Sequence, residues 1–332
     1  MERPPLRVLV TGASGFIGGH TCNVLSQAGA TVRALVRRTS DIRHLEKSAI
    51  EICYGDLSDP DSLRSACKNI DIVVHTAAVV GSFGDWSHYY EIGVLGTERL
   101  IEAAHQEGVA RFVHLSSIAV YGLKPHGKPV TESVEFDHVP QSWNHYVREK
   151  VISEELIWKA HAAGKIRATT LRPSIVIGAR DRNAVPRMID MLTFPISLMA
   201  GKPSNRLPIV CIDDCVDAIA RVVEKDDTIG KSYNISGHRH IAVADVLQLV
   251  GNKRNLRVPS TYLPTSLLFA PVGLLEWGWA KIGKSGEPPI TRISIVLAGY
   301  DYEISCQRAH QELGWFPKDE YESALEAALA TV

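Results

Sequence analysis

The sequence has no excess of charge of either sign and no long uninterrupted apolar run. Lys and Arg number 36 against 37 Asp and Glu, a formal net charge of -1. Nucleic-acid surfaces need a basic excess, so we expect no nucleic-acid partner. The longest apolar segment is Leu263–Ile282. Two prolines and two charged residues interrupt it: Pro264, Pro271, Glu276 and Lys281. The segment is therefore a poor membrane span. It could instead touch a membrane surface, line an apolar pocket, or pack as an ordinary helix or dimer contact.

Cysteine is also scarce, and its spacing fits neither a zinc site nor a small disulfide framework. The six residues are Cys22, Cys53, Cys67, Cys211, Cys215 and Cys306. We interpret them as reduced thiols in a cytoplasmic protein, and we expect no metal site. The stretch Met1–Arg7 carries charge and two prolines before the first apolar run, so we expect no signal peptide.

The first half of the chain alternates short apolar runs with helical patterns. Several runs are continuous and β-branched, which is typical of strands buried on both faces. The predicted strands are Arg7–Thr11, Thr31–Val36, Ile50–Cys53, Ile70–Thr76, Arg111–Ser116 and Ala168–Pro173. The predicted helices are Ile17–Ala28, Asp59–Cys67, Gly96–Gln106 and Tyr146–Ala163. This alternation predicts an α/β fold, a Rossmann-type doubly wound parallel sheet.

Beyond about Pro173 the pattern loosens, and the last hundred residues are mostly helical. The earlier alternating pattern returns in two places, a strand–helix unit at Leu207–Val223 and a short apolar run at Tyr233–Ser236. We therefore expect a nucleotide-binding domain at residues 1–175, to which residues 207–236 return. Residues 176–206 and 237–332 would form a smaller C-terminal substrate-binding lobe.

Three glycines stand between the first strand and the first helix, in the pattern Gly12-x-x-Gly15-x-x-Gly18. Glycines permit a tight turn and a close approach of the backbone to a pyrophosphate, which the helix N-terminus then binds. This strand–turn–helix context makes the motif a dinucleotide site rather than a plain turn. The predicted cofactor-binding residues here are Gly12, Ser14, Gly15, Phe16, Ile17 and Gly18.

The second strand ends in Arg37 and Arg38, where an NAD-binding chain usually carries an acidic residue. A guanidinium suits a 2′-phosphate because it gives bidentate, charge-assisted hydrogen bonds. The pattern favours NADP(H), with Arg37 the better candidate. The alternative is a solvated basic strand end, and Asp41 could still serve NAD(H).

Two further strand ends face the same predicted site. Asp56, followed by Leu57, could accept a hydrogen bond from the adenine amino group or simply close a turn. Thr76, Ala77 and Ala78 end the fourth strand, and such small residues would let the nicotinamide ribose approach the backbone.

Tyr146 and Lys150 are four residues apart at the start of the helix that follows the fifth strand. At this spacing both side chains lie on one helix face, and a nearby ammonium favours the phenolate, which lowers the tyrosine pKa toward working pH. The pair therefore predicts a general acid–base. Ser117, with Ser116 beside it, ends the fifth strand and could hydrogen-bond the substrate oxygen.

These motifs together resemble the extended short-chain dehydrogenase/reductases, the epimerase/dehydratase-like branch. The tail segments Gly286–Arg292 and Ala309–Pro317 are similar to those of 3β-hydroxysteroid dehydrogenases, and Val32–Arg37 to the NADP strand of dihydroflavonol reductases. The resemblance implies that Pro173 touches the nicotinamide, and that the chain is a homodimer through the helices Gly96–Gln106 and Tyr146–Ala163. Ile118 and Ala119 replace the acidic pair of dehydratases. Gly93 stands where many relatives carry asparagine.

The sequence therefore predicts an NAD(P)(H)-dependent oxidoreductase that interconverts a secondary alcohol and a ketone on a bulky, largely apolar substrate. A nucleotide-sugar epimerase is the main alternative, and a non-catalytic NADP-binding regulatory protein the second. The epimerase would need polar groups for a diphosphate, and the candidates are Arg180, Arg182, Arg187, Asn205 and Arg206.

Overall fold

The computed structural model describes residues 4–46, 49–81, 83–124, 126–138, 143–239, 241–282 and 286–332. The predicted stretch Met1–Arg7 is thus described only from residue 4, its first three residues lying outside these ranges. Within the described ranges, seven strands form one parallel sheet in the order β10-β6-β5-β4-β1-β2-β3. Their bounds are β1 (Arg7–Thr11), β2 (Thr31–Val36), β3 (Ile50–Tyr54), β4 (Ile72–His75), β5 (Arg111–Leu115), β6 (Ala168–Pro173) and β10 (Ser232–Ile235). The predicted Rossmann-type sheet is confirmed, with small differences at strand ends.

The central strands are apolar along their whole length because both of their faces are covered. In β1, Val8, Leu9 and Val10 are fully buried. Strand order reverses between β1 and β4, so the connections leave these two strands toward opposite sides. Ligands of such sheets bind at this reversal, outside the carboxyl ends of the strands.

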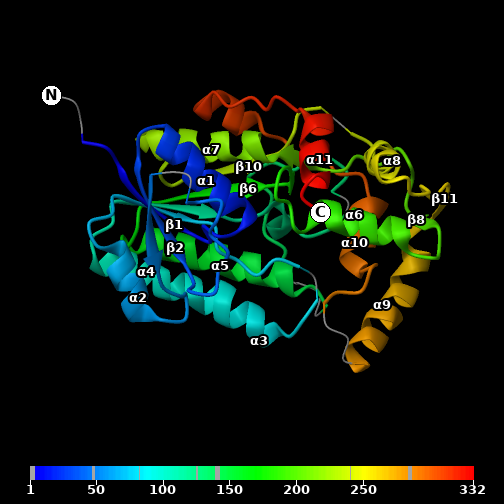
Figure 1. The fold of residues 1–332 in the computed structure, drawn as a ribbon, viewed down its shortest axis with the longest axis horizontal. Coiled ribbons are helices and arrows are strands. Elements are labelled where there is room, and N and C mark those ends of the chain that lie inside the picture. Colours follow the sequence, from blue (N-terminus) through cyan, green and yellow to red (C-terminus); the bar gives the residue numbers. More distant parts are fainter. Residues whose placement is uncertain are drawn as a thin grey trace.

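Helices cover both faces of the sheet (Figure 1). On one face, α1 (Phe16–Gln27) packs against α7 (Ile212–Glu224). On the other face, α2 (Pro60–Cys67) and α5 (His145–Ala162) flank α4 (Gly96–Gln106). A buried apolar cluster fills the space between each helix layer and the sheet.

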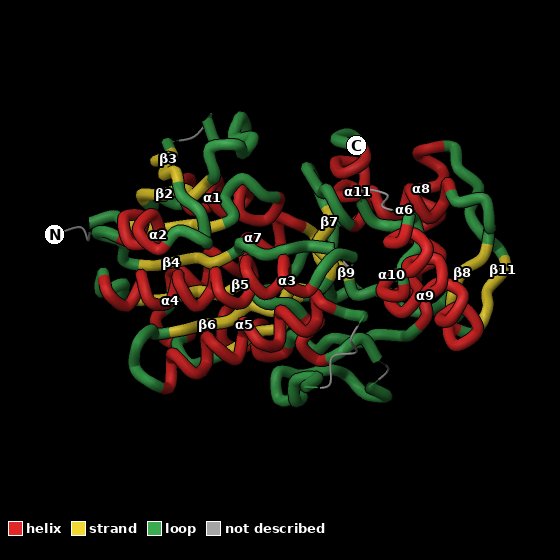
Figure 2. Tube along the Cα trace, turned by 90° about the horizontal axis from the view of Figure 1, so that it is seen from below, coloured by secondary structure: helices red, strands yellow, loops and turns green. Residues whose placement is uncertain are grey.

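The C-terminal part forms a second body beside the carboxyl ends of the strands (Figure 2). Its helices are α6 (Ala184–Thr193), α8 (Val243–Arg254), α9 (Thr265–Lys281), α10 (Arg292–Gly299) and α11 (Tyr321–Leu329). Two strand pairs lie outside the main sheet: β7 (Ile175–Ile177) with β9 (Ile209–Cys211), and β8 (Leu198–Ala200) with β11 (Thr261–Leu263). Residues 207–236 divide between the two bodies, because β10 joins the main sheet while β9 does not.

Short helical segments complete the described chain. They are α3 (Trp86–Tyr89), the π-helix η1 (Tyr90–Leu95), η2 (Ile118–Tyr121), η3 (Asp226–Thr228) and η4 (Ala309–Leu313). None of the helices described, α9 included, is long and apolar enough to cross a membrane.

Candidate functional site

The glycine loop is shaped by its own packing. Gly12 has φ +69°, and a Cβ there would lie 2.7 Å from the Ala77 nitrogen and 2.9 Å from the Thr76 hydroxyl. A Cβ on Gly18 would overlap the Gly12 carbonyl oxygen. The turn therefore lies directly on the end of β4, and any side chain at either glycine would push the two strand ends apart.

Gly15 is the N-cap of α1, and no side chain caps the helix or places a carboxylate in its first turn. A Cβ on Gly15 would meet only the Gly12 carbonyl, at 3.0 Å. The first-turn amides around Ser14, Phe16 and Ile17 therefore remain for an external acceptor, and the dipole favours an anion. A dinucleotide pyrophosphate fits this cradle.

The end of β2 presents two exposed cations. Arg37 and Arg38 are both exposed, and the Arg38 guanidinium lies 5.0 Å from the centroid of the Tyr54 ring. Asp41, the acidic alternative for NAD, makes two side-chain hydrogen bonds with Arg43, at 2.9 and 2.6 Å. These bonds hold the pKa of Asp41 well below its usual range and engage its carboxylate.

Asp56 and Leu57 follow β3 with different surroundings. One Asp56 carboxylate oxygen accepts hydrogen bonds from the Ser58 amide at 2.9 Å and hydroxyl at 2.7 Å, which closes a turn. The Ser58 amide lowers the pKa of Asp56 most, and Arg37 adds to the effect. Leu57 is buried in the core, where a Cβ on Gly96 would lie 2.9 Å from its Cβ. Asp56 thus lies beside Arg37, whereas Leu57 is a packing residue.

The predicted acid–base pair lies in the first two turns of α5. Asn144 caps this helix, its side-chain oxygen accepting from the Val147 amide at 3.1 Å. Tyr146 is half-buried, and Lys150 is 3% exposed with its Nζ 5.9 Å from the tyrosine ring centroid. Tyr146 also packs against the apolar cluster formed by η2. Ser117 is the N-cap of η2, so the three predicted catalytic side chains come from adjoining elements.

Ser116 points elsewhere. Its hydroxyl donates to Glu154 Oε2 at 2.5 Å, and Arg172 donates to the same carboxylate at 2.6 Å. Arg172 also donates to the Tyr121 hydroxyl at 2.7 Å. Burial by itself lowers the pKa of Arg172, but Glu154 and Tyr121 more than offset it and raise the value. This buried network anchors β5, β6 and η2, and Pro173 follows Arg172 at the carboxyl end of β6.

The surroundings of Lys150 include residues that the sequence reasoning missed. Glu149 is buried, and its Oε2 lies 3.7 Å from Lys150 Nζ. His75 hydrogen-bonds Thr11 Oγ1 at 2.7 Å and Thr97 Oγ1 at 2.9 Å. Burial, together with the Lys150 charge, lowers the pKa of His75 to about 3. The signal available in sequence was the combination of Gly93 with a glutamate directly before the lysine.

Four of the five polar residues proposed for a diphosphate are engaged elsewhere, and the fifth, Arg182, is exposed. Arg206 pairs with Asp301 at 2.7 Å and with Glu303 at 2.8 Å. Asn205 is buried and donates to the Ala298 carbonyl at 3.1 Å.

Two more of the five are also engaged. Arg187 pairs with Glu287 and donates to the Pro288 carbonyl at 2.8 Å. Arg180 follows β7, and its guanidinium reaches α1, where it donates to the Phe16 carbonyl at 3.4 Å, near the glycine loop rather than in the lobe. The described residues also contain no cluster of three or more metal-ligating side chains.

Known proteins resemble this chain over most of its length. The profile of the NAD dependent epimerase/dehydratase family matches residues 8–236, and the chain belongs to that family. It is similar to the 2-alkyl-3-oxoalkanoate reductase of Stenotrophomonas maltophilia (strain K279a), with 27% identity over 98% of this chain and 99% of that protein. It is 30% identical to Sterol demethylase protein B of Methylococcus capsulatus (strain ATCC 33009 / NCIMB 11132 / Bath), over 94% of each chain. The crystal structure of gox2253 superposes with a TM-score of 0.81 at 28% identity, over 99% of this chain and 98% of that one.

The predicted resemblance to the extended short-chain dehydrogenase/reductases is thereby confirmed. The protein is an NAD(P)-dependent enzyme of that superfamily.

Proposed function

We propose that this protein is an NADP(H)-dependent oxidoreductase that interconverts a secondary alcohol and a ketone on a bulky, largely apolar substrate of sterol-, polyketide- or flavonoid-like character. One observation carries the proposal. Tyr146 and Lys150 lie on adjacent turns of α5, which contacts the helix η2 that Ser117 caps, at the same edge of the sheet as the glycine loop. A proton donor and a dinucleotide cradle thus share one site.

Each residue of the site has a separate role in the proposed reaction. The nicotinamide, when bound, supplies or accepts the hydride. Tyr146 gives its hydroxyl proton to the ketone oxygen, or takes a proton from the alcohol in the reverse direction. Ser117 donates a hydrogen bond to that oxygen and stabilises its developing negative charge. Lys150 stabilises the phenolate and binds the ribose, while Gly12–Gly18 and the Thr76–Ala78 segment hold the dinucleotide.

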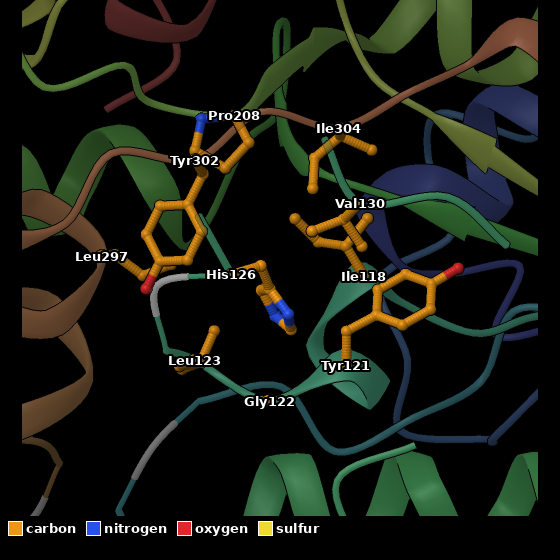
Figure 3. Close-up of a pocket in the computed structure, with 10 residues that line it drawn as sticks. All are labelled: Ile118, Tyr121, Gly122, Leu123, His126, Val130, Pro208, Leu297, Tyr302 and Ile304. Carbon is orange, nitrogen blue, oxygen red and sulfur yellow. The ribbon is translucent and has the colours of Figure 1, made fainter. Parts of the chain in front are cut away.

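The residues that follow Ser117 lie in apolar surroundings. Ile118, the next residue, lines a small pocket between η2 and the C-terminal body (Figure 3). Apolar groups from Leu123, Val130, Leu297 and Ile304 form much of its wall. Figure 3 shows the His126 ring among them as one of few polar groups. This pocket is too small for a bulky ligand. An apolar substrate is supported instead by the two named relatives, which carry alkanoate and sterol names.

The epimerase alternative receives less support from the side chains. A nucleotide-sugar diphosphate needs unpaired cationic or amide donors. Arg206 and Arg187 are already paired with carboxylates, and Asn205 is buried against a backbone carbonyl. Binding a diphosphate there would require breaking these contacts.

The NADP(H) preference rests on Arg37. Among the described residues Arg37 has no carboxylate partner in an ion pair, while Asp41 is engaged by Arg43. Fluorescence titration with NADPH and NADH tests the preference. We expect tighter NADPH binding, lost in Arg37→Ala and retained in Arg64→Ala, whose arginine is exposed on α2. Tighter NADH binding that ignores Arg37 would overturn the NADP assignment and favour an NAD-linked dehydrogenase or epimerase.

The catalytic assignment is tested by turnover of a panel of apolar ketones with NADPH. Tyr146→Phe should abolish reduction and leave NADPH binding nearly intact, whereas Tyr90→Phe, an exposed tyrosine, should change neither. Binding without turnover of any ketone or nucleotide sugar would instead indicate a non-catalytic regulatory protein.

Partner contacts are part of the same proposal. Along α9, Leu267, Leu274 and Trp277 are 62%, 69% and 63% exposed and share one face by their spacing. We propose that this face makes peripheral contact with a membrane surface. Sedimentation with liposomes should deplete the wild type but not Trp277→Ser, and no depletion of either would exclude the contact.

The second contact is with another copy of the chain. We propose a homodimer through α4 and α5. We also propose a cytoplasmic location, with which the six free thiols are consistent. Sedimentation equilibrium at twice the chain mass would support it, and a monomer at micromolar concentration would refute it.

A further inference from the structure

Gly93 and Glu149 occupy one buried space. Gly93 lies in the π-helix η1, and a Cβ built on it would fall 2.5 Å from the Glu149 carboxyl carbon and closer still to a carboxylate oxygen. Both residues are buried, although they lie on different elements. The absence of a side chain at residue 93 is therefore what leaves room for the carboxylate of residue 149.

The carboxylate that fills this space faces Lys150. Glu149 Oε2 lies 3.7 Å from Lys150 Nζ, and the two side chains are 2% and 3% exposed. This Oε2 accepts no hydrogen bond from any described residue. A buried carboxylate without such a bond is unfavourable unless a nearby charge compensates it. The Lys150 ammonium is the compensating charge.

Other groups around Lys150 cannot supply a counter-charge. His75 on β4 has its pKa lowered to about 3 by burial and by Lys150. Burial, His75 and Lys150 also lower the pKa of His114 on β5 well below its ordinary value. On α3, burial raises the pKa of Tyr89 to about 12, with Glu149 adding to the effect. All three side chains are therefore neutral near pH 7.

The remaining charged groups near Lys150 already have their own partners. Arg172 on β6 is paired with Glu154. On α5 itself, burial raises the pKa of Glu149, and the smaller opposing effects of Lys150 and Ser153 do not cancel it. Glu149 thus titrates above an ordinary glutamate and is the carboxylate closest to the ammonium.

We propose that Glu149 is the positioning residue of Lys150: its carboxylate, in the space left by Gly93, keeps the lysine charged and directed at the cofactor ribose. The inference rests on the proposed role of Lys150. It assigns the polar support of Lys150 to a residue of α5 rather than to one of η1. The two positions then form one unit, since a side chain at 93 would force the Glu149 side chain out of its present position.

The first test is the pH dependence of NADPH affinity in Glu149→Gln, measured by fluorescence from pH 6 to 9. Glutamine keeps the shape but removes the charge, so the buried ammonium loses its proton more readily as pH rises. We expect the variant to bind about as well as wild type at pH 6 and about tenfold more weakly at pH 9. Glu155→Gln is the matched control, because Glu155 is on the same helix, 46% exposed and paired with His138.

Parallel pH profiles for Glu149→Gln and wild type would overturn the proposal. A purely structural role would weaken binding equally at every pH, so the profile separates the two roles. Because the assay needs binding and no turnover, it remains valid if no ketone is reduced.

The second test requires neither cofactor nor substrate. Gly93→Ala should lower the melting temperature of wild type, since the new Cβ would overlap Glu149. In a Glu149→Ser background the same change should leave the melting temperature unchanged or raise it, because alanine favours a helix over glycine. An equal loss in both backgrounds would show that Gly93 and Glu149 are not coupled. This outcome would refute the shared space while leaving the proposed oxidoreductase function untouched.

Discussion

Replacing Glu154 by glutamine should strongly destabilise the protein, because the buried network below Ser117 depends on its charge. Glu154 is fully buried and accepts from four donors: Arg172 Nη2 at 2.6 Å, Arg172 Nε at 3.0 Å, Ser116 Oγ at 2.5 Å and Trp158 Nε1 at 3.0 Å. A glutamine would present an NH₂ group to one of these donors, and it would leave the buried Arg172 guanidinium without a counter-charge.

The magnitude follows from the burial of both partners. Removing one partner of a buried ion pair costs about 3–5 kcal/mol. Urea denaturation with an m-value of about 3 kcal/mol/M would then show a midpoint lower by about 1–1.7 M, with m unchanged. Glu326→Gln is the control, because Glu326 and Lys253 are 57% and 56% exposed. Loss of that surface pair should change stability by less than about 1 kcal/mol.

A double variant separates the loss of the whole ion pair from the loss of one partner. Glu154→Met with Arg172→Met removes both charges and should recover much of the lost stability, because well-packed apolar residues replace buried pairs at little cost. Equal midpoints for Glu154→Gln and the Glu326→Gln control would refute the argument. Because Glu154 anchors Ser116, we also expect Glu154→Gln to lose ketone reduction at urea concentrations well below its unfolding midpoint.

Three further predictions test other parts of the structure. Gly12→Ala should abolish NADPH binding and lower the melting temperature, because φ is +69° and a Cβ would lie 2.7 Å from the Ala77 nitrogen; normal binding by calorimetry would contradict this. His75 has its pKa lowered by burial and by Lys150 to about 3, so the unfolded state binds more protons and stability falls as pH drops from about 6.5 toward 3. In His75→Gln the fall in unfolding free energy, measured in urea at several pH values, should be shallower by up to about 1.4 kcal/mol per pH unit, and an unchanged slope would argue against a neutral imidazole. In the native protein, a thiol reagent should react first at Cys53, which is half-buried while the other five thiols are buried; fast reaction of several thiols would contradict this packing.

Much of the fold was readable from sequence, because its signals are local. β-branched runs such as those of β1 and β4 predicted strands buried on both faces, and the strand–glycine–helix order around Gly12 predicted the nucleotide loop. The structure has both, with helix and strand ends shifted by a residue or two. The short strand β9 was different. Its apolar run looked like part of the main sheet, yet it pairs with β7, since strand pairing depends on distant partners.

For the site, the chain alone determined which residue types were available and their spacing along one helix or turn. The four-residue spacing of Tyr146 and Lys150 places both on one face of α5 wherever that helix lies. Only the tertiary structure decided that Arg206 forms ion pairs, because the carboxylates that bind it lie 95 and 97 residues further along the chain. The coupling of Gly93 to Glu149 was also hidden. Helical periodicity says which residues share a face of one helix, but the overlap of a missing Cβ with a carboxylate depends on how η1 and α5 pack together.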